Sequence, residues 1–155
     1  MGLIATVRSR AIAELERVKW LAPLLGRLAV GLLFMSTGWG KVHEIAKVAG
    51  FFRTLGIPAP GFNARLTATT ELVGGLLVLA GLGTRLAALP LAFTMVIAIL
   101  TAKRATVDGV SALLGLEEWS YLVFFVWLAL AGAGRLSLDA LIARRRRAGR
   151  QPATS

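Results

Sequence analysis

Four long apolar runs divide the chain, and polar residues gather between them and at both ends. A helix that crosses the hydrocarbon core of a bilayer needs about 20 apolar residues, with a range of about 17–25. Three of the runs fit this length, and the last reaches it if it includes Glu117, Glu118 and the segment up to Leu136. Four such runs leave no polar faces for water, so the pattern predicts four membrane-spanning helices. The runs cover about residues 21–39, 66–82, 86–102 and 119–133.

The connections between the runs predict how the helices are arranged. Only Gly83, Thr84 and Arg85 separate the second run from the third. So short a link joins antiparallel helices, which predicts an all-α, up-down-up-down four-helix bundle in the membrane over residues 21–136. Apolar residues recur at helical spacing in residues 1–20 and in the first outer loop, at residues 42–55, and both stretches are predicted to be amphipathic interfacial helices. Residues 137–155 form the predicted basic tail.

The basic residues orient the predicted bundle. The chain has 155 residues and a net charge of +10, although only 17% of its residues are charged. Most of its 18 lysines and arginines lie in the two terminal segments and the link at residues 83–85. Cytoplasmic loops carry an excess of such residues, so both termini are predicted to be cytoplasmic. The tail "RRRRAGRQPATS" is attributed to this rule and to attraction to anionic lipid rather than to nucleic acid, because no base-reading element accompanies it.

The composition limits the chemistry of the chain. There is no cysteine and there is one histidine, His43. Disulfides, thiolate metal sites, iron–sulfur clusters, covalent c-type haem and bis-histidine haem are therefore excluded on this chain. We predict no metal site, no catalytic constellation and no covalently bound cofactor.

One carboxylate interrupts the second apolar run. Glu71 lies about 9 Å into the predicted span, where an isolated charge costs at least ~2.5–3.5 kcal/mol. We expect it to face the bundle interior, and Gly74 and Gly75, three and four residues on, share its face. Such small residues let another helix approach closely.

The first predicted helix carries a matching stripe. Its members are Arg27, Gly31, Phe34, Gly38 and Lys41. We predict Gly31 and Gly38 as packing positions, and Lys41 and Arg27 as candidate partners of Glu71. Lys103, at the outer end of the third run, completes a predicted polar cluster, and Glu117 or Glu118 is a further candidate member there.

Three interpretations of this cluster stay open. The charges could only lock the helices in register. They could line a pocket for a small polar or quinone-like ligand, or Glu71 could be a protonated proton site.

The chain resembles the DoxX family of small bacterial and archaeal membrane proteins over about residues 24–139. The residues that carry the resemblance form three motifs in order. They are "GRLAVGLLFMSTGWGKV", "FFRTLGIPAPGFNARLTATTELVGGLLVLAGLGTRLAAL" and "GAGRLSLDALI". The resemblance implies four transmembrane helices in a bacterial or archaeal cytoplasmic membrane. Many relatives have a histidine near the end of the third helix, where this chain reads "AILTAKRAT", with Lys103, so histidine-dependent chemistry is not carried over.

The resemblance also sets the functional expectations. Family members are linked to quinone-dependent respiratory or sulfur oxidation, and some are membrane partners of soluble redox proteins. We therefore expect an accessory or anchoring membrane subunit of a redox complex, with membrane lipids and a protein partner or a second copy as its partners. The alternatives are a quinone-interacting oxidoreductase subunit, with quinone or lipid as ligand, and a small-solute or lipid transporter. The transporter is disfavoured because no broken helix or inverted repeat is evident.

Overall fold

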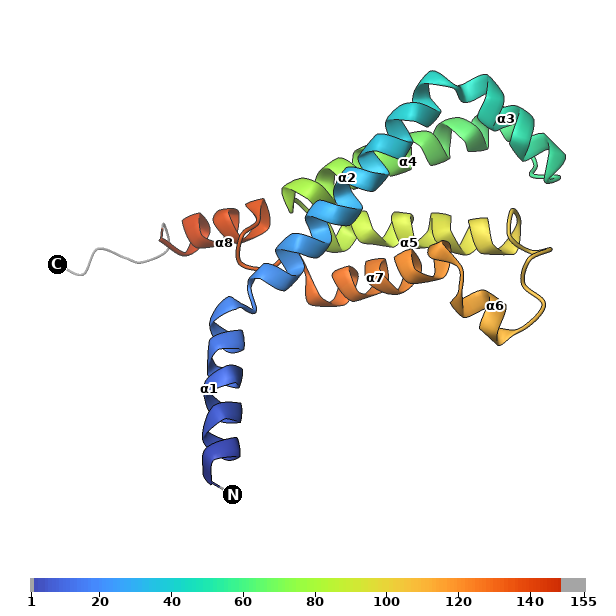
Figure 1. Cartoon of the computed structure of the whole chain (residues 1–155). Coiled ribbons are helices and arrows are strands. Elements are labelled where there is room, and N and C mark those ends of the chain that lie inside the picture. The colour runs from blue at the N-terminus through green and yellow to red at the C-terminus, as the bar shows by residue number, and fades with distance from the viewer. Residues whose placement is uncertain (1, 149–155) are drawn as a thin grey trace.

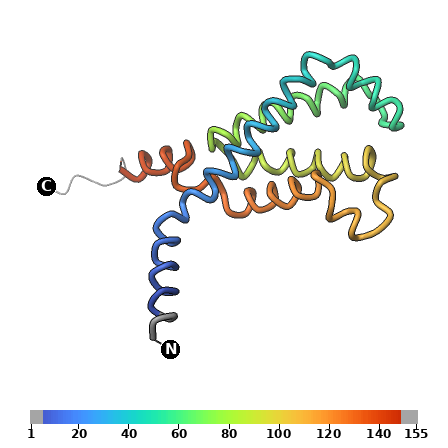
Figure 2. Tube along the Cα trace, in the orientation of Figure 1, coloured from blue at the N-terminus to red at the C-terminus, as the bar shows by residue number. Residues whose placement is uncertain are grey.

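The computed structural model describes residues 2–148, with side chains from residue 6 onward, and is built of helices (Figures 1 and 2). No β-strand occurs in this part of the chain. The all-α prediction is therefore confirmed. In chain order the helices are α1 (Gly2–Val18), α2 (Leu21–His43), α3 (Ile45–Thr54), α4 (Pro60–Ala80), α5 (Thr84–Leu100), α6 (Val110–Leu114), α7 (Glu117–Ala131) and α8 (Leu138–Ala148).

The four apolar runs correspond to α2, α4, α5 and α7, with different ends. Helix α4 begins at Pro60, six residues before the predicted start, because proline fits the first turn of a helix, where its missing N–H is not needed. Helix α7 begins at Glu117, as expected. Its predicted extension to Leu136 was wrong. Gly132 ends the helix with a φ of 83°, a backbone conformation that glycine adopts readily.

The segments outside the runs are also helical. Helices α1 and α3 occupy the two stretches with amphipathic spacing. Two helices, α6 and α8, had no prediction of their own. Helix α8 occupies most of the predicted basic tail at 137–155, and the tail's last residues, 149–155, lie outside the described part of the chain.

A tight link joins α4 to α5. The backbone N–H of Leu82 donates to the carbonyl of Leu77 over 3.0 Å, and the N–H of Gly81 donates to that of Val78 over 3.1 Å. This Schellman arrangement needs a left-handed residue after the helix, and Gly81 supplies it with a φ of 69°. Gly83 is also left-handed, with a φ of 56°. The two glycines let the chain reverse within three residues.

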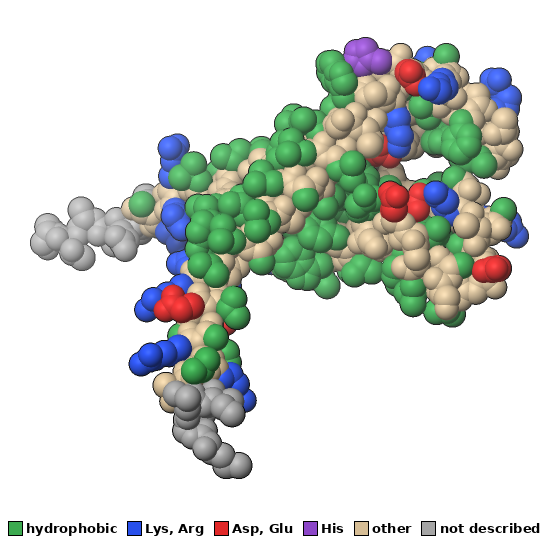
Figure 3. Space-filling model, viewed as in Figure 1, with side chains coloured by type: hydrophobic (Ala, Val, Ile, Leu, Met, Phe, Trp, Pro, Cys, Tyr) green, Lys and Arg blue, Asp and Glu red, His purple; other side chains and the backbone are tan. Residues whose placement is uncertain are grey.

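The helices form two closely packed pairs. Helix α2 packs along α4, and α5 packs along α7, while α3 folds back against α4. The pairs meet near the α4–α5 link and diverge toward the opposite end, which we call the outer end (Figure 1). There the space-filling view shows an open notch between them (Figure 3). Both α1 and α8 leave from the other end, where the pairs meet (Figure 2).

The hydrophobic core lies where the two pairs meet. Phe34 of α2 makes edge contacts with two rings of α7, Phe125 at 4.8 Å and Tyr121 at 5.4 Å between centroids. Leu91 of α5 and Val78 of α4 are fully buried beside them. This core contains residues from all four helices and holds the two pairs together.

The outer surface of the four helices is strongly apolar (Figure 3). Large side chains such as Leu32, Leu76, Leu89 and Leu130 are about half exposed or more, at 49%, 52%, 57% and 74%. By length and composition, one described helix, α2, qualifies as a membrane span, with a mean hydropathy of 1.5, and α5 is a shorter apolar helix. The four predicted spans therefore stay a prediction at this level.

Candidate functional site

Glu71 is bonded directly to two side chains of α2. Its side chain is 4% exposed, and one carboxylate oxygen lies 2.5 Å from the Lys41 ammonium. The other oxygen accepts a hydrogen bond from the Thr37 hydroxyl at 3.3 Å. Lys41 and Thr37 are four residues apart, so they lie on one face of α2. Both carboxylate oxygens of Glu71 thus have a donor within the same helix pair.

A second ion pair lies on the other helix pair. The Lys103 ammonium is 3.3 Å from one carboxylate oxygen of Glu118, in the first turn of α7. The other oxygen of Glu118 is buried and has no hydrogen-bond partner among the described residues. In the space-filling view, acidic and basic side chains lie on both sides of the notch at the outer end (Figure 3). The predicted cluster is thus resolved into two ion pairs, one on each helix pair, and no ion pair in the described chain joins Glu71 to Lys103.

Arg27 lies apart from this cluster, so its predicted pairing with Glu71 is corrected. Its side chain instead donates to backbone carbonyls at the end where the helix pairs meet. Two of them, Val78 at 3.0 Å and Leu79 at 3.2 Å, end α4. The other two, Ala133 at 2.5 Å and Leu136 at 3.0 Å, follow α7. The last carbonyls of a helix lack partners within it, and the fork of guanidinium donors supplies them.

Asp139 is a structural residue that the sequence did not single out. Its carboxylate accepts hydrogen bonds from the backbone N–H groups of Gly83, at 2.8 Å, and Thr84, at 3.1 Å, which begin α5. Its own N–H donates to the carbonyl of Gly81 at 2.9 Å. Two features of the sequence could have indicated this role. Asp139 lies in the motif "GAGRLSLDALI", and the link before α5 has no side chain of its own that caps the first N–H groups of that helix. Asp139 thereby ties the first turn of α8 to the α4–α5 link.

The predicted glycines lie where helices touch. A methyl group built on Gly38 would clash with the backbone of α4 at Leu72, and one on Gly75 would clash with the backbone of α2 at Met35. One on Gly31 would come within 2.8 Å of the backbone of Leu79. Gly74 instead faces α5, where a methyl group would lie 2.9 Å from the Leu91 side chain. Helices α2 and α4 therefore contact each other through backbone, which brings Lys41 within reach of Glu71.

The side chains of the site can form hydrogen bonds and ion pairs. Among the described residues, no group of three or more His, Asp or Glu side chains is placed to hold a metal ion. His43 lies on the surface at the outer end of α2, where its ring packs against Trp39 at 4.5 Å. The arrangement can hold the carbonyl or hydroxyl groups of a ligand, or lock helices together.

The Lys41–Glu71 pair makes a testable prediction. In Lys41→Met the buried carboxylate loses its cation, and we expect the free energy of unfolding to fall by about 2–3 kcal/mol. This is at or below the range for fully buried pairs, because Lys41 is 35% exposed. The double change Lys41→Met with Glu71→Met should recover most of this loss. Thermal unfolding in detergent measures both. The matched control, Lys47→Met, breaks an exposed pair with Glu44 and should cost less than about 1 kcal/mol. A double variant as unstable as Lys41→Met would contradict the expectation.

Comparison with family models matches residues 22–104 to DoxX, more than half of the chain. This chain belongs to the DoxX family. It is 41% identical over 132 residues to an uncharacterized membrane protein, Rv3486, of Mycobacterium tuberculosis. That match covers 77% of this chain and 80% of the relative. It is 33% identical over 128 residues to a putative oxidoreductase, CatD, of Bacillus subtilis, with 81% and 90% covered. It is 31% identical over 129 residues to the inner membrane protein YqjF of Escherichia coli, with 83% and 97% covered.

No solved structure matches this DoxX chain. The resemblance inferred from its motifs is confirmed, and the DoxX chain is an all-α membrane protein with bacterial relatives.

Proposed function

We propose that the DoxX chain crosses the cytoplasmic membrane four times, as an up-down-up-down bundle of α2, α4, α5 and α7. The apolar outer surface of these helices supports this placement, since lipid can cover it. Helix α7 has 15 residues and is about 22 Å long, so the non-helical residues that follow it must complete the crossing. Helices α1 and α8 leave the bundle at the same end, which fits two cytoplasmic termini.

The absence of cysteine makes this topology directly testable. Single cysteines at exposed positions would be labelled with a membrane-impermeant maleimide in intact cells. We expect Thr54→Cys and Thr106→Cys to react from outside, and Ser9→Cys, Arg85→Cys and Ala148→Cys to react only after lysis. The unchanged chain gives the background. Reaction of Arg85→Cys from outside would contradict the four crossings.

Within the membrane, we propose that this chain is an accessory or anchoring subunit of a redox complex. The observation that carries the proposal is that the charges inside the helix bundle are satisfied by the chain itself. Glu71 is bonded to Lys41 and Thr37, and Arg27 is bonded to four carbonyls. These charges therefore stabilise the fold, and under this proposal a partner protein carries out the redox chemistry. That one relative is named a putative oxidoreductase supports the redox context.

Copurification tests the accessory role. The tagged full chain would be extracted from native membranes in a mild detergent, with an unrelated tagged four-helix membrane protein as the control. We expect a stoichiometric partner whose absorbance shows a flavin, haem or iron–sulfur centre, and loss of that partner from membranes when the chain is deleted. Two results together would overturn the role. They are purification of the tagged chain without such a partner, and an unchanged membrane distribution of the redox enzymes in cells that lack the chain.

One observation favours a second candidate, a quinone-interacting subunit. The unpartnered oxygen of Glu118 and the half-exposed ammonium of Lys103 lie at the outer end, where the notch opens. An ammonium group can donate a hydrogen bond to a quinone carbonyl, and a carboxylate oxygen can accept one from a hydroquinone hydroxyl. Under this candidate, Glu118→Gln lowers turnover of the complex, and added quinone reduces that loss. Turnover at the level of the unmodified protein in Glu118→Gln would exclude a quinone-binding role for Glu118.

A further inference from the structure

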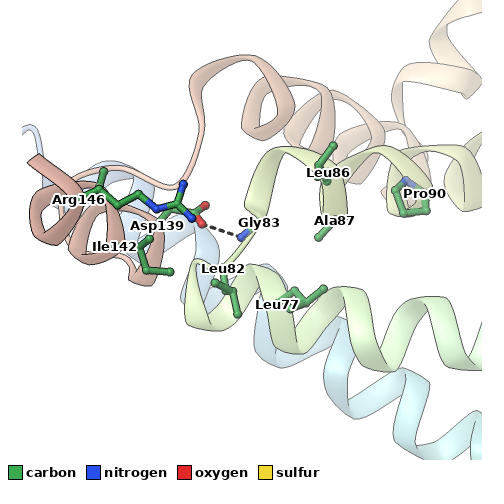
Figure 4. Close-up of a pocket in the computed structure, with 10 residues that line it drawn as sticks. Leu77, Leu82, Gly83, Leu86, Ala87, Pro90, Asp139, Ile142 and Arg146 are labelled. Carbon is green, nitrogen blue, oxygen red and sulfur yellow. Dashed lines mark hydrogen bonds between the residues drawn. The ribbon is translucent and has the colours of Figure 1, made fainter. Parts of the chain in front are cut away.

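A groove lies beside the first turns of α5, at the end where both termini leave the bundle (Figure 4). Its volume is 710 Å³, within the ~300–1,000 Å³ typical of ligand pockets. Figure 4 shows the side chains that line it, which come from α4, the link, α5 and α8. The apolar ones include Leu77, Leu86, Pro90 and Ile142.

The protein leaves these apolar walls uncovered. Leu86 is 75% exposed and Ile142 is 40% exposed. Helix α8 is attached mainly through the hydrogen bonds of Asp139 to the α4–α5 link, and no other described helix packs closely along it. The space between α8 and the α4–α5 hairpin is therefore open to whatever surrounds the bundle, and its walls favour a hydrocarbon chain.

The positive charge beside the groove favours a ligand with an anionic headgroup. Arg146 lines the α8 side of the groove and forms no ion pair with any described residue. It belongs to a run of four arginines, at residues 144–147. The one carboxylate that lines the groove, Asp139, already accepts hydrogen bonds from two backbone N–H groups of α5. Basic residues near a membrane surface attract anionic headgroups, and arginine pairs well with phosphate.

We propose that this groove binds one anionic phospholipid, with an acyl chain along Leu77, Leu86 and Pro90 and its phosphate at Arg146. The proposal rests on the membrane placement proposed above, which puts α8 at the cytoplasmic interface, and it is independent of the redox partner. A free phosphate would leave the apolar walls unused, and a zwitterionic lipid would bring a choline cation close to the run of four arginines, which repels it. The bound lipid fills the space between α8 and the bundle.

Native mass spectrometry of the delipidated full chain tests the site. Dioleoyl phosphatidylglycerol is added in parallel with dioleoyl phosphatidylcholine. We expect the first to bind more tightly, and Arg146→Gln to weaken its binding about 5-fold, the ratio that corresponds to ~1 kcal/mol per basic residue near a headgroup. The matched control, Arg145→Gln, removes the same charge from α8 at a position that does not line the groove, so we expect it to weaken binding less than Arg146→Gln does.

A second pair of variants tests the apolar wall. Leu86→Trp fills the groove from an exposed position and should abolish tight binding, whereas Leu89→Trp, at a position 57% exposed on the same helix, should not. Equal binding of the two lipids, equal losses in Arg146→Gln and Arg145→Gln, or unchanged binding in Leu86→Trp would each overturn the site. So would displacement of phosphatidylglycerol by inorganic phosphate at millimolar concentration.

Failure of this site and failure of the proposed function give different results. Leu86→Trp should keep the copurifying partner while it loses the lipid. If no redox partner copurifies with the unmodified chain, but the chain still prefers the anionic lipid, the accessory role is rejected and the lipid site is retained. Labelling of Ala148→Cys from outside rejects the proposed topology, and the lipid ratios are measured without reference to it.

Discussion

Replacing Arg27 with methionine is expected to destabilise the protein more than any other single change at a charged residue. Methionine keeps much of the volume but removes this donor from the carbonyls of Leu79, Ala133 and Leu136. The carbonyl of Val78 also loses Arg27 but keeps its hydrogen bond from the N–H of Gly81. A buried polar group without a partner costs about 1–3 kcal/mol. Water entering from the nearby surface will satisfy some of the three unpaired carbonyls, so we expect the free energy of unfolding to fall by about 3–5 kcal/mol.

The measurement is the fraction of monodisperse protein that remains after heating in detergent. For a chain of this size, a loss of 3–5 kcal/mol lowers the midpoint by roughly 10 °C. Arg144→Met, at an exposed position on α8, is the matched control and should leave the midpoint within about 2 °C. Arg27→Lys should fall between, because an ammonium group has three donors on one atom and cannot span carbonyls of both α4 and the segment that follows α7. A midpoint for Arg27→Met equal to that of Arg144→Met would show that these bonds do not stabilise the fold.

Gly38→Ala is expected to have the second large effect, through a single methyl group. That methyl would lie 2.6 Å from the Cα of Leu72, closer than real contacts allow, so the α2 and α4 backbones must separate. Overpacking of this kind typically costs 1–3 kcal/mol, and here it also moves Lys41 away from Glu71. We expect a loss of about 3 kcal/mol.

The control lies two residues away on the same helix. A methyl group on Gly40 meets nothing within 4 Å, and Gly40→Ala should stabilise α2 by up to about 1 kcal/mol, since alanine favours helix over glycine. The two variants would be compared by thermal unfolding under identical conditions. Equal stability of Gly38→Ala and Gly40→Ala would mean that the two backbones do not pack closely in the membrane.

The sequence predicted the positions of the main helices well, because each depends on local apolar runs. It also offered Lys41 as one candidate partner of Glu71, since both residues lie on glycine-bearing faces at similar depth. Its failure with Arg27 has a physical cause. A buried arginine was expected to pair with a carboxylate, whereas its partners here are backbone carbonyls, which carry no signal in the sequence. The role of Asp139 was missed for the same reason, because its partners are backbone N–H groups of a distant link.

The notch at the outer end could not have been foreseen. Four apolar runs predict an up-down-up-down bundle, but the angle between the two helix pairs depends on side-chain packing around Phe34 and Phe125. Lys103 was therefore expected beside Glu71, whereas the structure pairs it with Glu118 on its own side of the notch.

The bonds of Arg27 also affect the order of events during synthesis. Arg27 is in the first apolar helix, and its partners Val78 and Ala133 are made 51 and 106 residues later. At about 5–20 residues per second, the last of these carbonyls leaves the ribosome roughly 5–20 s after the arginine. In the topology proposed above, α2 carries for that interval a charge with no protein partner, close enough to the helix start to extend toward the cytoplasmic headgroups. Under that proposal, Arg27 leaves the headgroups for its carbonyl partners only after α7 and the segment that follows it have been made.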